Sequence, residues 1–485
     1  MLANFPLINT ILTVFFWFIF SGWAIALPML VLLPRRQNPA AARSWLLLIF
    51  FMPWLGLLLY LLIGENRLPP ERLAKHRQIV EKLKAIPKWS DDPAIVAPPL
   101  EPALVPTVTL AQALGQMPVL GGNQVELIPG YTEIIDRLIA DIDLAERHVH
   151  LLYYIIADDE TGHRLAEALE RAIKRGVKCR VLVDSFGALP FIKKLGDKMV
   201  SEGIELHYIL PIGPLRHHLT RVDLRNHRKI AVIDGQVAYT GSQNIVNADY
   251  GYDIEGLTYE ELMVRLTGPI VLQLQAIFAG DWYMESDELL TDPDFFPSLP
   301  ASGQVLAQAV PSGPSYGVEN FQRLVVALIH DARQRVVITT PYFIPDESFI
   351  QALETAVMSG VEITLIVSSK VDQAIVGWAQ SSYYEQLLAA GVKLYVYGQA
   401  LLHAKHMSVD DDLALIGSGN MDRRSFDLNY EITMLFYGTQ VVQALHAEER
   451  RYIDRSEELS LTAWQQRPAK EKFLQNIAKL VSPML

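Results

Sequence analysis

Two long apolar runs open the chain and distinguish its N-terminal part from the rest. No charged residue occurs from Phe5 to Leu33, and a second uncharged run extends from Trp45 to Ile63. Nineteen helical residues cover roughly 28 Å, close to the thickness of the hydrocarbon layer of a bilayer. Because only a short loop separates the runs, they predict a transmembrane hairpin. A cleaved signal peptide is the alternative for the first run, which is too long and has no basic start.

Basic residues flank the hairpin on both sides. Three arginines lie in its loop, whereas six lysines and arginines follow the second run between residues 67 and 84. This excess favours a cytoplasmic location for the large C-terminal part. Since both sides are basic, the opposite orientation stays open.

Residues 89–118 are rich in Pro and Ala and predict an extended tether, after which helix-like and strand-like segments alternate. Residues 165–185 align with residues 349–369 at a constant offset of 184. Each copy predicts a helix, a glycine stop and a β-branched strand. The strand-like segments 148–155 and 335–344 correspond in the same way. The pattern predicts an α/β fold with two homologous domains, each with a mixed sheet, packed face to face and pseudo-symmetrically.

These patterns suggest four regions. They are a hairpin in 1–66 with spans at about 7–33 and 45–63, a basic and Pro-rich linker in 67–118, a first α/β domain in 119–298, and a second in 299–485.

Composition narrows the function classes. The formal net charge of −12 argues against a nucleic-acid-binding protein, which usually has a basic face. The single cysteine, Cys179, permits neither an intrachain disulfide nor a cysteine-based metal site, and its strand-like surroundings predict a core position.

Each half of the repeat carries the same polar motif, H-x-K-x4-D-x6-G-S-x-N. The first copy consists of His227, Lys229, Asp234, Gly241, Ser242 and Asn244, and the second of His403, Lys405, Asp410, Gly417, Ser418 and Asn420. The residues after each lysine are strand-like, and on a strand positions i and i+2 share a face. Histidine and lysine therefore project together, and a return strand brings serine and asparagine beside them. Imidazole, ammonium and neutral donors together suit a phosphate group.

The duplicated motif resembles that of the phospholipase D superfamily. The stretches 340–346, 376–398 and 417–431, together with the hairpin, resemble more closely its bacterial cardiolipin synthases of the two-span type. The resemblance implies an inner-membrane enzyme without metal or other cofactor. It implies transfer of a phosphatidyl group from one phosphatidylglycerol to another, through a covalent phosphohistidine, with release of glycerol. Phosphatidylethanolamine as co-substrate stays open, as do other anionic phospholipids as ligands.

The resemblance also implies roles for the motif residues. His227 is expected to be the nucleophile and His403 the acid and base, although the symmetry of the motifs leaves the reverse open. The lysines and asparagines are expected to hold the phosphoryl oxygens, assisted by the serines. The carboxylate that orients each histidine is expected downstream of it in the same half, Glu431 after His403 and Glu261, or its neighbour Glu260, after the first motif.

For several other residues the sequence allows two interpretations. Asp234 and Asp410 belong to the motif, but their type favours a structural role in a turn. Tyr154 and Tyr342 end equivalent strands and either line the substrate cleft or pack. The basic segment 215–229 is either a solvated loop or a contact for anionic headgroups. Its adjacent pair His217 and His218 does not have the spacing of metal ligands.

The C-terminal tail places apolar residues at helical spacing, which favours docking onto a domain over membrane binding. They are Phe473, Ile477, Leu480 and Val481.

Three other functions compete with phosphatidyl transfer. A hydrolytic phospholipase D would use the same residues with water as acceptor. A nuclease of the superfamily is disfavoured by the acidic charge and the hairpin. A catalytically inactive scaffold would be expected to lack a motif histidine or lysine, and both motifs are complete.

Overall fold

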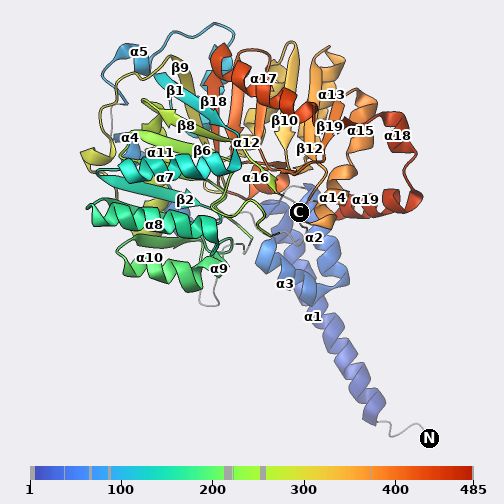
Figure 1. Cartoon of the computed structure of the whole chain (residues 1–485). Coiled ribbons are helices and arrows are strands. Elements are labelled where there is room, and N and C mark those ends of the chain that lie inside the picture. The colour runs from blue at the N-terminus through green and yellow to red at the C-terminus, as the bar shows by residue number, and fades with distance from the viewer. Residues whose placement is uncertain are drawn as a thin grey trace, which may run out of the picture. The chain divides into compact units, whose positions relative to one another are not determined.

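Figure 1 shows the computed structural model of the chain. The structure describes residues 6–37, 39–64, 68–85, 89–211, 221, 223–251, 258–371 and 373–482. These residues divide into two compact units. A small unit contains the helices that precede residue 71, and a large unit contains both copies of the motif.

The small unit consists of three packed helices, α1 (Pro6–Arg36), α2 (Pro39–Phe51) and α3 (Pro53–Ile63). The second apolar run is therefore not one helix, as the sequence pattern suggested. Pro53 has no backbone N–H and restricts the residue before it, so the helix ends at Phe51 and a new one begins. A Cβ on Gly56 would lie 2.8 Å from the Cα of Ile49, so glycine allows α2 and α3 to pack this closely.

Within the described residues, none of the helices combines the length and the apolar character that crossing a bilayer requires.

The linker region 67–118 contains three helices among its described residues, and two of them lie in residues 89–118, which were expected to be an extended tether. They are α4 (Pro70–Ala85), α5 (Pro93–Val96) and α6 (Val105–Gly115). Prolines, which suggested extended chain, occupy the first turns of all three helices, where a missing N–H is tolerated. Helix α4 packs on α11 (Ile270–Ser286), where Arg72 pairs with Glu285 and Lys75 Nζ donates to the carbonyl oxygen of Met284 over 2.9 Å.

The repeat is confirmed by two equivalent sets of strands. In chain order, the first half supplies β1 (Leu120–Ile128), β2 (His148–Tyr153), β3 (Lys178–Asp184), β4 (Glu205–Ile209), β5 (Ile230–Ile233), β6 (Val237–Gly241) and β8 (Met263–Thr267). The second half supplies β9 (Val305–Ser312), β10 (Arg335–Thr340), β12 (Glu362–Ser368), β13 (Lys393–Tyr397), β15 (His406–Val409), β16 (Leu413–Gly417), β18 (Glu431–Tyr437) and an added edge strand, β19 (Ser456–Glu458).

Each half has the predicted mixed sheet. In the first half, β2, β3 and β4 are parallel, while β5, β6, β8 and β1 pair antiparallel. Helices α7 (Tyr131–Leu144) and α8 (Glu160–Lys174) cover one face, and α11 contacts the sheet from the other. The equivalent helices of the second half are α12 (Asn320–Asp331) and α13 (Glu347–Met358).

The halves join side by side and not face to face as expected. Strand β1 pairs antiparallel with β9, which merges both halves into one sheet of 15 strands (Figure 1). This pairing satisfies the backbone groups of two strands that would otherwise be exposed edges. Because each half contributes its first strand, the two copies of the motif lie on either side of the junction.

Candidate active site

Each motif is built on a β-hairpin. His227 and Lys229 directly precede β5, and the return strand β6 leads into Ser242 and Asn244. In the second half β15 and β16 form the equivalent hairpin. The predicted hairpins are therefore present in both halves, and histidine and lysine lie at the same end of each.

Asp234 and Asp410 lie at the opposite end of each hairpin from the histidines. Their backbones adopt positive φ values of 54° and 50°. The Asp234 carboxylate accepts hydrogen bonds from the backbone N–H groups of residues 146–148, each over 2.8 Å. Asp410 binds the N–H groups of residues 333–335 in the same way. Both carboxylates thus fix the starts of β2 and β10, so the geometry gives them a structural role and no direct chemical one.

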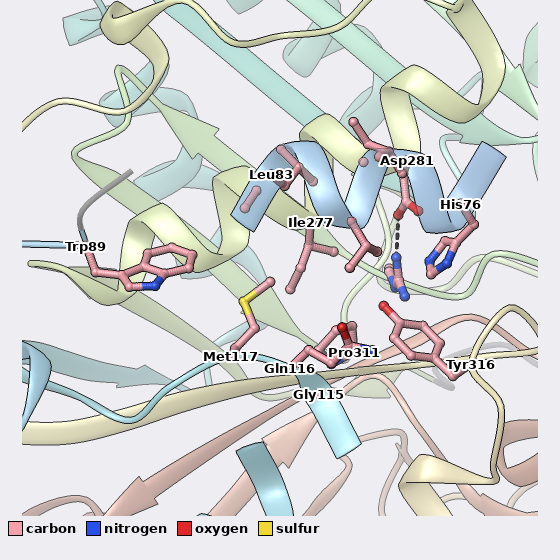
Figure 2. Close-up of a pocket in the computed structure, with 15 residues that line it drawn as sticks. His76, Leu83, Trp89, Gly115, Gln116, Met117, Ile277, Asp281, Pro311 and Tyr316 are labelled. Carbon is pink, nitrogen blue, oxygen red and sulfur yellow. Dashed lines mark hydrogen bonds and ion pairs between the residues drawn. The ribbon is translucent and has the colours of Figure 1, made fainter. Parts of the chain in front are cut away.

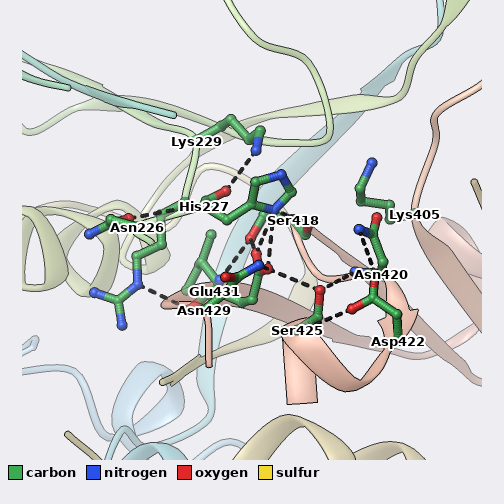
Figure 3. Close-up of polar contacts among 12 residues, drawn as sticks. Asn226, His227, Lys229, Lys405, Ser418, Asn420, Asp422, Ser425, Asn429 and Glu431 are labelled. Carbon is green, nitrogen blue, oxygen red and sulfur yellow. Dashed lines mark hydrogen bonds and ion pairs between the residues drawn. The ribbon is translucent and has the colours of Figure 1, made fainter. Parts of the chain in front are cut away.

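Each motif histidine contacts the glutamate of the other half of the chain and not, as was expected, the one downstream in its own half. Nδ1 of His227 lies 3.1 Å from both carboxylate oxygens of Glu431 (Figure 3). Nδ1 of His403 lies 2.7 Å from Oε1 of Glu261. An ionised carboxylate only accepts, so Nδ1 of each ring carries the proton. Nε2 of each neutral ring is then the basic nitrogen.

This exchange follows from how the chain enters each motif. The N–H of His227 donates to the carbonyl oxygen of Tyr430 over 2.8 Å, and the N–H of His403 donates to that of Glu260 over 2.7 Å. Each entering segment thus runs beside the residue that precedes the other half's glutamate. The Glu260 side chain itself pairs with Arg451, so the register left open by the sequence resolves to Glu261.

The motif serines hold the glutamates. Oγ of Ser242 donates to Glu261 and Oγ of Ser418 to Glu431, each over 2.5 Å. Glu431 receives two further hydrogen bonds, from Ser425 over 3.1 Å and from Asn429 over 3.3 Å (Figure 3). Glu431 is therefore more extensively bonded than Glu261.

The side chains of the two motif lysines are buried beside the motif histidines. Nζ of Lys229 donates to the carbonyl oxygen of His227 over 2.7 Å, and Lys405 does the same to His403 over 2.6 Å. Burial lowers the pKa of Lys229 to about 7 and that of Lys405 to about 8. An anion that reaches these two ammonium groups is therefore attracted strongly, because little water screens the charges there.

The ionisation of the imidazoles is set by the same burial. It lowers the pKa of His403 to about 4 and also lowers that of His227, against the opposing charges of the glutamates. Burial alone would raise the pKa of Glu431, but its contact with His227, the charge of Lys229 and the hydrogen bond from Ser418 bring it to about 2. The site thus holds two carboxylates and two neutral imidazoles beside the lysines.

Comparison with known proteins identifies the family. Residues 138–282 and 325–452, more than half of the chain, match the family described as cardiolipin synthase, PLD-like domain. The chain belongs to this family. Residues 23–65 also match a family described as phospholipase D-nuclease N-terminal.

Full-length relatives agree. Cardiolipin synthase A of Edwardsiella ictaluri is 33% identical over 490 residues, covering 98% of this chain and 100% of the relative. Cardiolipin synthase A of Escherichia coli O1:K1 / APEC is 31% identical over 495 residues and 100% of both chains. The crystal structure of phosphatidylserine synthase from Haemophilus influenzae shares the fold, with a TM-score of 0.60 and 16% identity over 78% of this chain and 100% of that one.

As a member of the cardiolipin synthase, PLD-like family, the chain is a phosphatidyltransferase, and its aromatic residues can be compared at the two motifs. The ring of Tyr154 packs edge-on against His227, with centroids 5.0 Å apart. At His403 the ring of Tyr259 packs edge-on, with centroids 5.5 Å apart. Tyr259 and Glu260 form a short strand of the first half, which pairs with Leu401 and Leu402 of the second half, just before His403.

The motif asparagines have backbone and side-chain partners. Asn244 Oδ1 accepts the N–H of Ile155 over 3.2 Å, and Asn420 Nδ2 donates to Asp422 over 3.1 Å. The amide of Asn420 is oriented by Asp422, a residue for which the sequence motif gave no role.

Arg228, between the histidine and lysine of the first motif, points away from them. It donates to the carbonyl oxygen of Glu431 over 3.0 Å and pairs with Asp281 over 2.7 Å. On that side lies a mostly apolar cavity between α4 and α11, lined by His76, Trp89 and Tyr316 among others (Figure 2). Since neighbouring residues of an extended segment face opposite ways, this cavity lies behind the motif and is not where the imidazoles act.

Residues 215–220 and 222 of the predicted headgroup contact in 215–229 lie outside the described residues, His217 and His218 among them.

Proposed function

We propose that this chain is a cardiolipin synthase, which transfers a phosphatidyl group from one phosphatidylglycerol to the hydroxyl of a second and releases glycerol. The observation that carries the proposal is the pair of buried imidazoles, each oriented by a glutamate and placed beside a buried lysine. Two such groups are what a two-step displacement at phosphorus requires, one to attack and one to exchange a proton. No step needs a cofactor.

In the proposed reaction, Nε2 of His227 attacks phosphorus and His403 protonates the departing glycerol oxygen. The second lipid's hydroxyl then attacks the phosphohistidine while His403 removes its proton. The hydrogen bonds to the glutamates support this division of roles. Glu431 shares its charge among more donors than Glu261, so Glu261 stabilises an imidazolium at its histidine better.

The substrate charge completes the site. The positive charges of the two lysines balance the negative charges of the two glutamates. A bound phosphodiester therefore adds one uncompensated negative charge, which raises the pKa of both histidines. One proton can then be taken up at His403, although its pKa is about 4 before that charge arrives. Lys229 and Lys405, with Asn244 and Asn420, hold the phosphoryl oxygens in this proposal.

We further propose that the N-terminal helices anchor the enzyme in the bacterial inner membrane as a hairpin, with the motifs on the cytoplasmic side. Support comes from the uncharged runs and from the flanking basic residues. Reporter fusions before residue 6 and after residue 485 should both report the cytoplasm. Reporters on opposite faces would exclude the hairpin.

The reaction is tested by product analysis. Purified full-length protein in micelles of phosphatidylglycerol with labelled headgroup should release glycerol and form cardiolipin in equal amounts. Phosphatidic acid as the main product would instead identify a hydrolase. A product containing ethanolamine, when phosphatidylethanolamine is added, would identify a second co-substrate.

A further inference from the structure

The strands that lead to the active-site mouth end in the same way in both halves. The last residue of β3, Asp184, accepts the N–H of Asn226, next to His227, over 3.0 Å. The last residue of β12, Ser368, accepts the N–H of Leu402, next to His403, over 3.1 Å. Segments that follow β3 and β12 therefore border the mouth of the site.

Both of these segments expose large apolar side chains. Phe186 and Leu189 follow β3, and Ile375 and Trp378 lie on α14 (Ala374–Ser381) after β12. Each is at least 40% exposed. Apolar residues at equivalent places around the mouth form a surface that water solvates poorly.

Helix α19 (Ala469–Val481) extends this surface. It packs beside α14 (Figure 1) and is fixed to Tyr383 through Ser482 and Lys479. The apolar stripe of this helix was expected to dock onto the domain, but Phe473 is 64% and Leu480 is 77% exposed, and Ile477 between them is also exposed. The expectation was wrong because the helix uses its other face, with buried Gln475 and Ala478, for packing.

The charged residues of α19 indicate what contacts its exposed apolar stripe. Helix α19 carries three lysines and one glutamate, in a chain with a net charge of −12. Exposed apolar residues flanked by lysines are typical of helices that lie in the headgroup region of anionic bilayers.

We propose that α14, α19 and the segment after β3 form a membrane-contact face, which seats the mouth of the active site on the surface of an anionic bilayer. The occupant is the lipid surface itself, from which both substrates leave without crossing water. The proposal rests on the proposed lipid substrate, but the test below does not use catalysis, so either can fail alone.

The test uses single cysteines in the full-length protein, reconstituted in vesicles that contain phosphatidylglycerol. Burial raises the pKa of the native Cys179 to about 12, so an introduced cysteine is labelled selectively. Trp378→Cys, Phe473→Cys and Leu480→Cys carry a fluorophore. Matched controls are Leu144→Cys and Met358→Cys, whose native side chains are 77% and 79% exposed. Leu144 is the last residue of α7 and Met358 the last of α13, and each helix leads into the start of a strand, at the end of the sheet away from the proposed face.

Labels on the proposed face should be quenched by lipid-attached quenchers at least about twofold more than the controls, and shielded from aqueous iodide. Equal behaviour of face and control labels would overturn the proposal. Shielding from both quenchers, together with crosslinking between copies, would also overturn it and identify a dimer interface.

A functional readout separates lipid contact from folding. Phe473→Gln with Leu480→Gln should raise the KM for phosphatidylglycerol in vesicles by about tenfold, given the apolar area removed from contact. The turnover of short-chain, monomeric phosphatidylglycerol should not change. An equal loss with both substrates would contradict a role in membrane contact.

Discussion

Because each histidine contacts the glutamate of the other half, substitutions of the neighbouring residues Glu261 and Glu260 should have very different effects. Glu261→Gln keeps the shape of the side chain and one oxygen facing Nδ1 of His403. Ser242 can then turn its hydroxyl to the carbonyl oxygen of Leu262, 3.1 Å away, so the substitution removes charge with little loss of hydrogen bonds. Glu260→Gln, one position earlier, changes a side chain that pairs with Arg451 instead.

The magnitude follows from the geometry. Two unit charges roughly 4 Å apart interact by about 4 kcal/mol at an effective dielectric constant of 20. The protonated state of His403, required for departure of glycerol, loses this stabilisation in Glu261→Gln. A loss of about 4 kcal/mol corresponds to about a thousandfold lower kcat. Glu260→Gln should remain within about twofold of the wild type, since a partly exposed pair contributes little.

Release of labelled glycerol from phosphatidylglycerol in mixed micelles measures both variants. Loss of Glu261 also lowers the pKa of His403, so the limb of the rate profile that needs the protonated ring should move to lower pH. Thermal unfolding checks that both variants fold. A Glu261→Gln rate within tenfold of the wild type, or a larger loss in Glu260→Gln, would refute the assignment of Glu261 to His403.

Three further predictions follow from individual contacts. Asp234→Ala leaves three backbone N–H groups without their acceptor, so it should lower the free energy of unfolding by about 3 kcal/mol or more, measured by thermal unfolding, while the folded fraction keeps its kcat. Ser425→Ala, which removes one donor from Glu431, should lower kcat about tenfold with little change in KM, and a rise in KM alone would place Ser425 at the substrate. Because the pKa values of Lys229 and Lys405 are about 7 and about 8, both lysines lose charge as the pH rises from 7 to 9, so KM should increase over that range; a flat KM would argue against phosphate binding by the lysines.

Much of the large unit could be predicted because its signals are local or repeated. The alternating helices and strands, the hairpins and both polar motifs all follow from spacing within a few residues. The partner of each histidine could not be predicted in this way. It depends on the pairing of β1 with β9 and on the entry of each motif beside the other half, which the periodicity of either half does not encode.

The N-terminal part shows the opposite limitation. Hydrophobicity alone suggested one helix in 45–63, but Pro53 divides it, and the prolines before residue 118 start helices where they suggested extended chain. In the tail, periodicity correctly predicted a helix but assigned its apolar stripe to the interior, since spacing does not specify what a stripe contacts. Local proline geometry decided the first two cases, and tertiary packing decided the third.

The central claim is that a phosphatidyl group is carried by His227 and released with the help of His403. Incubation of His403→Ala with a phosphatidyl donor, followed by alkaline quenching and mass spectrometry of the digested protein, tests it directly. The account predicts a phosphatidyl adduct on the peptide that contains His227, and none in His227→Ala. An adduct on His403 in the His227→Ala variant, with none on His227, would contradict the account.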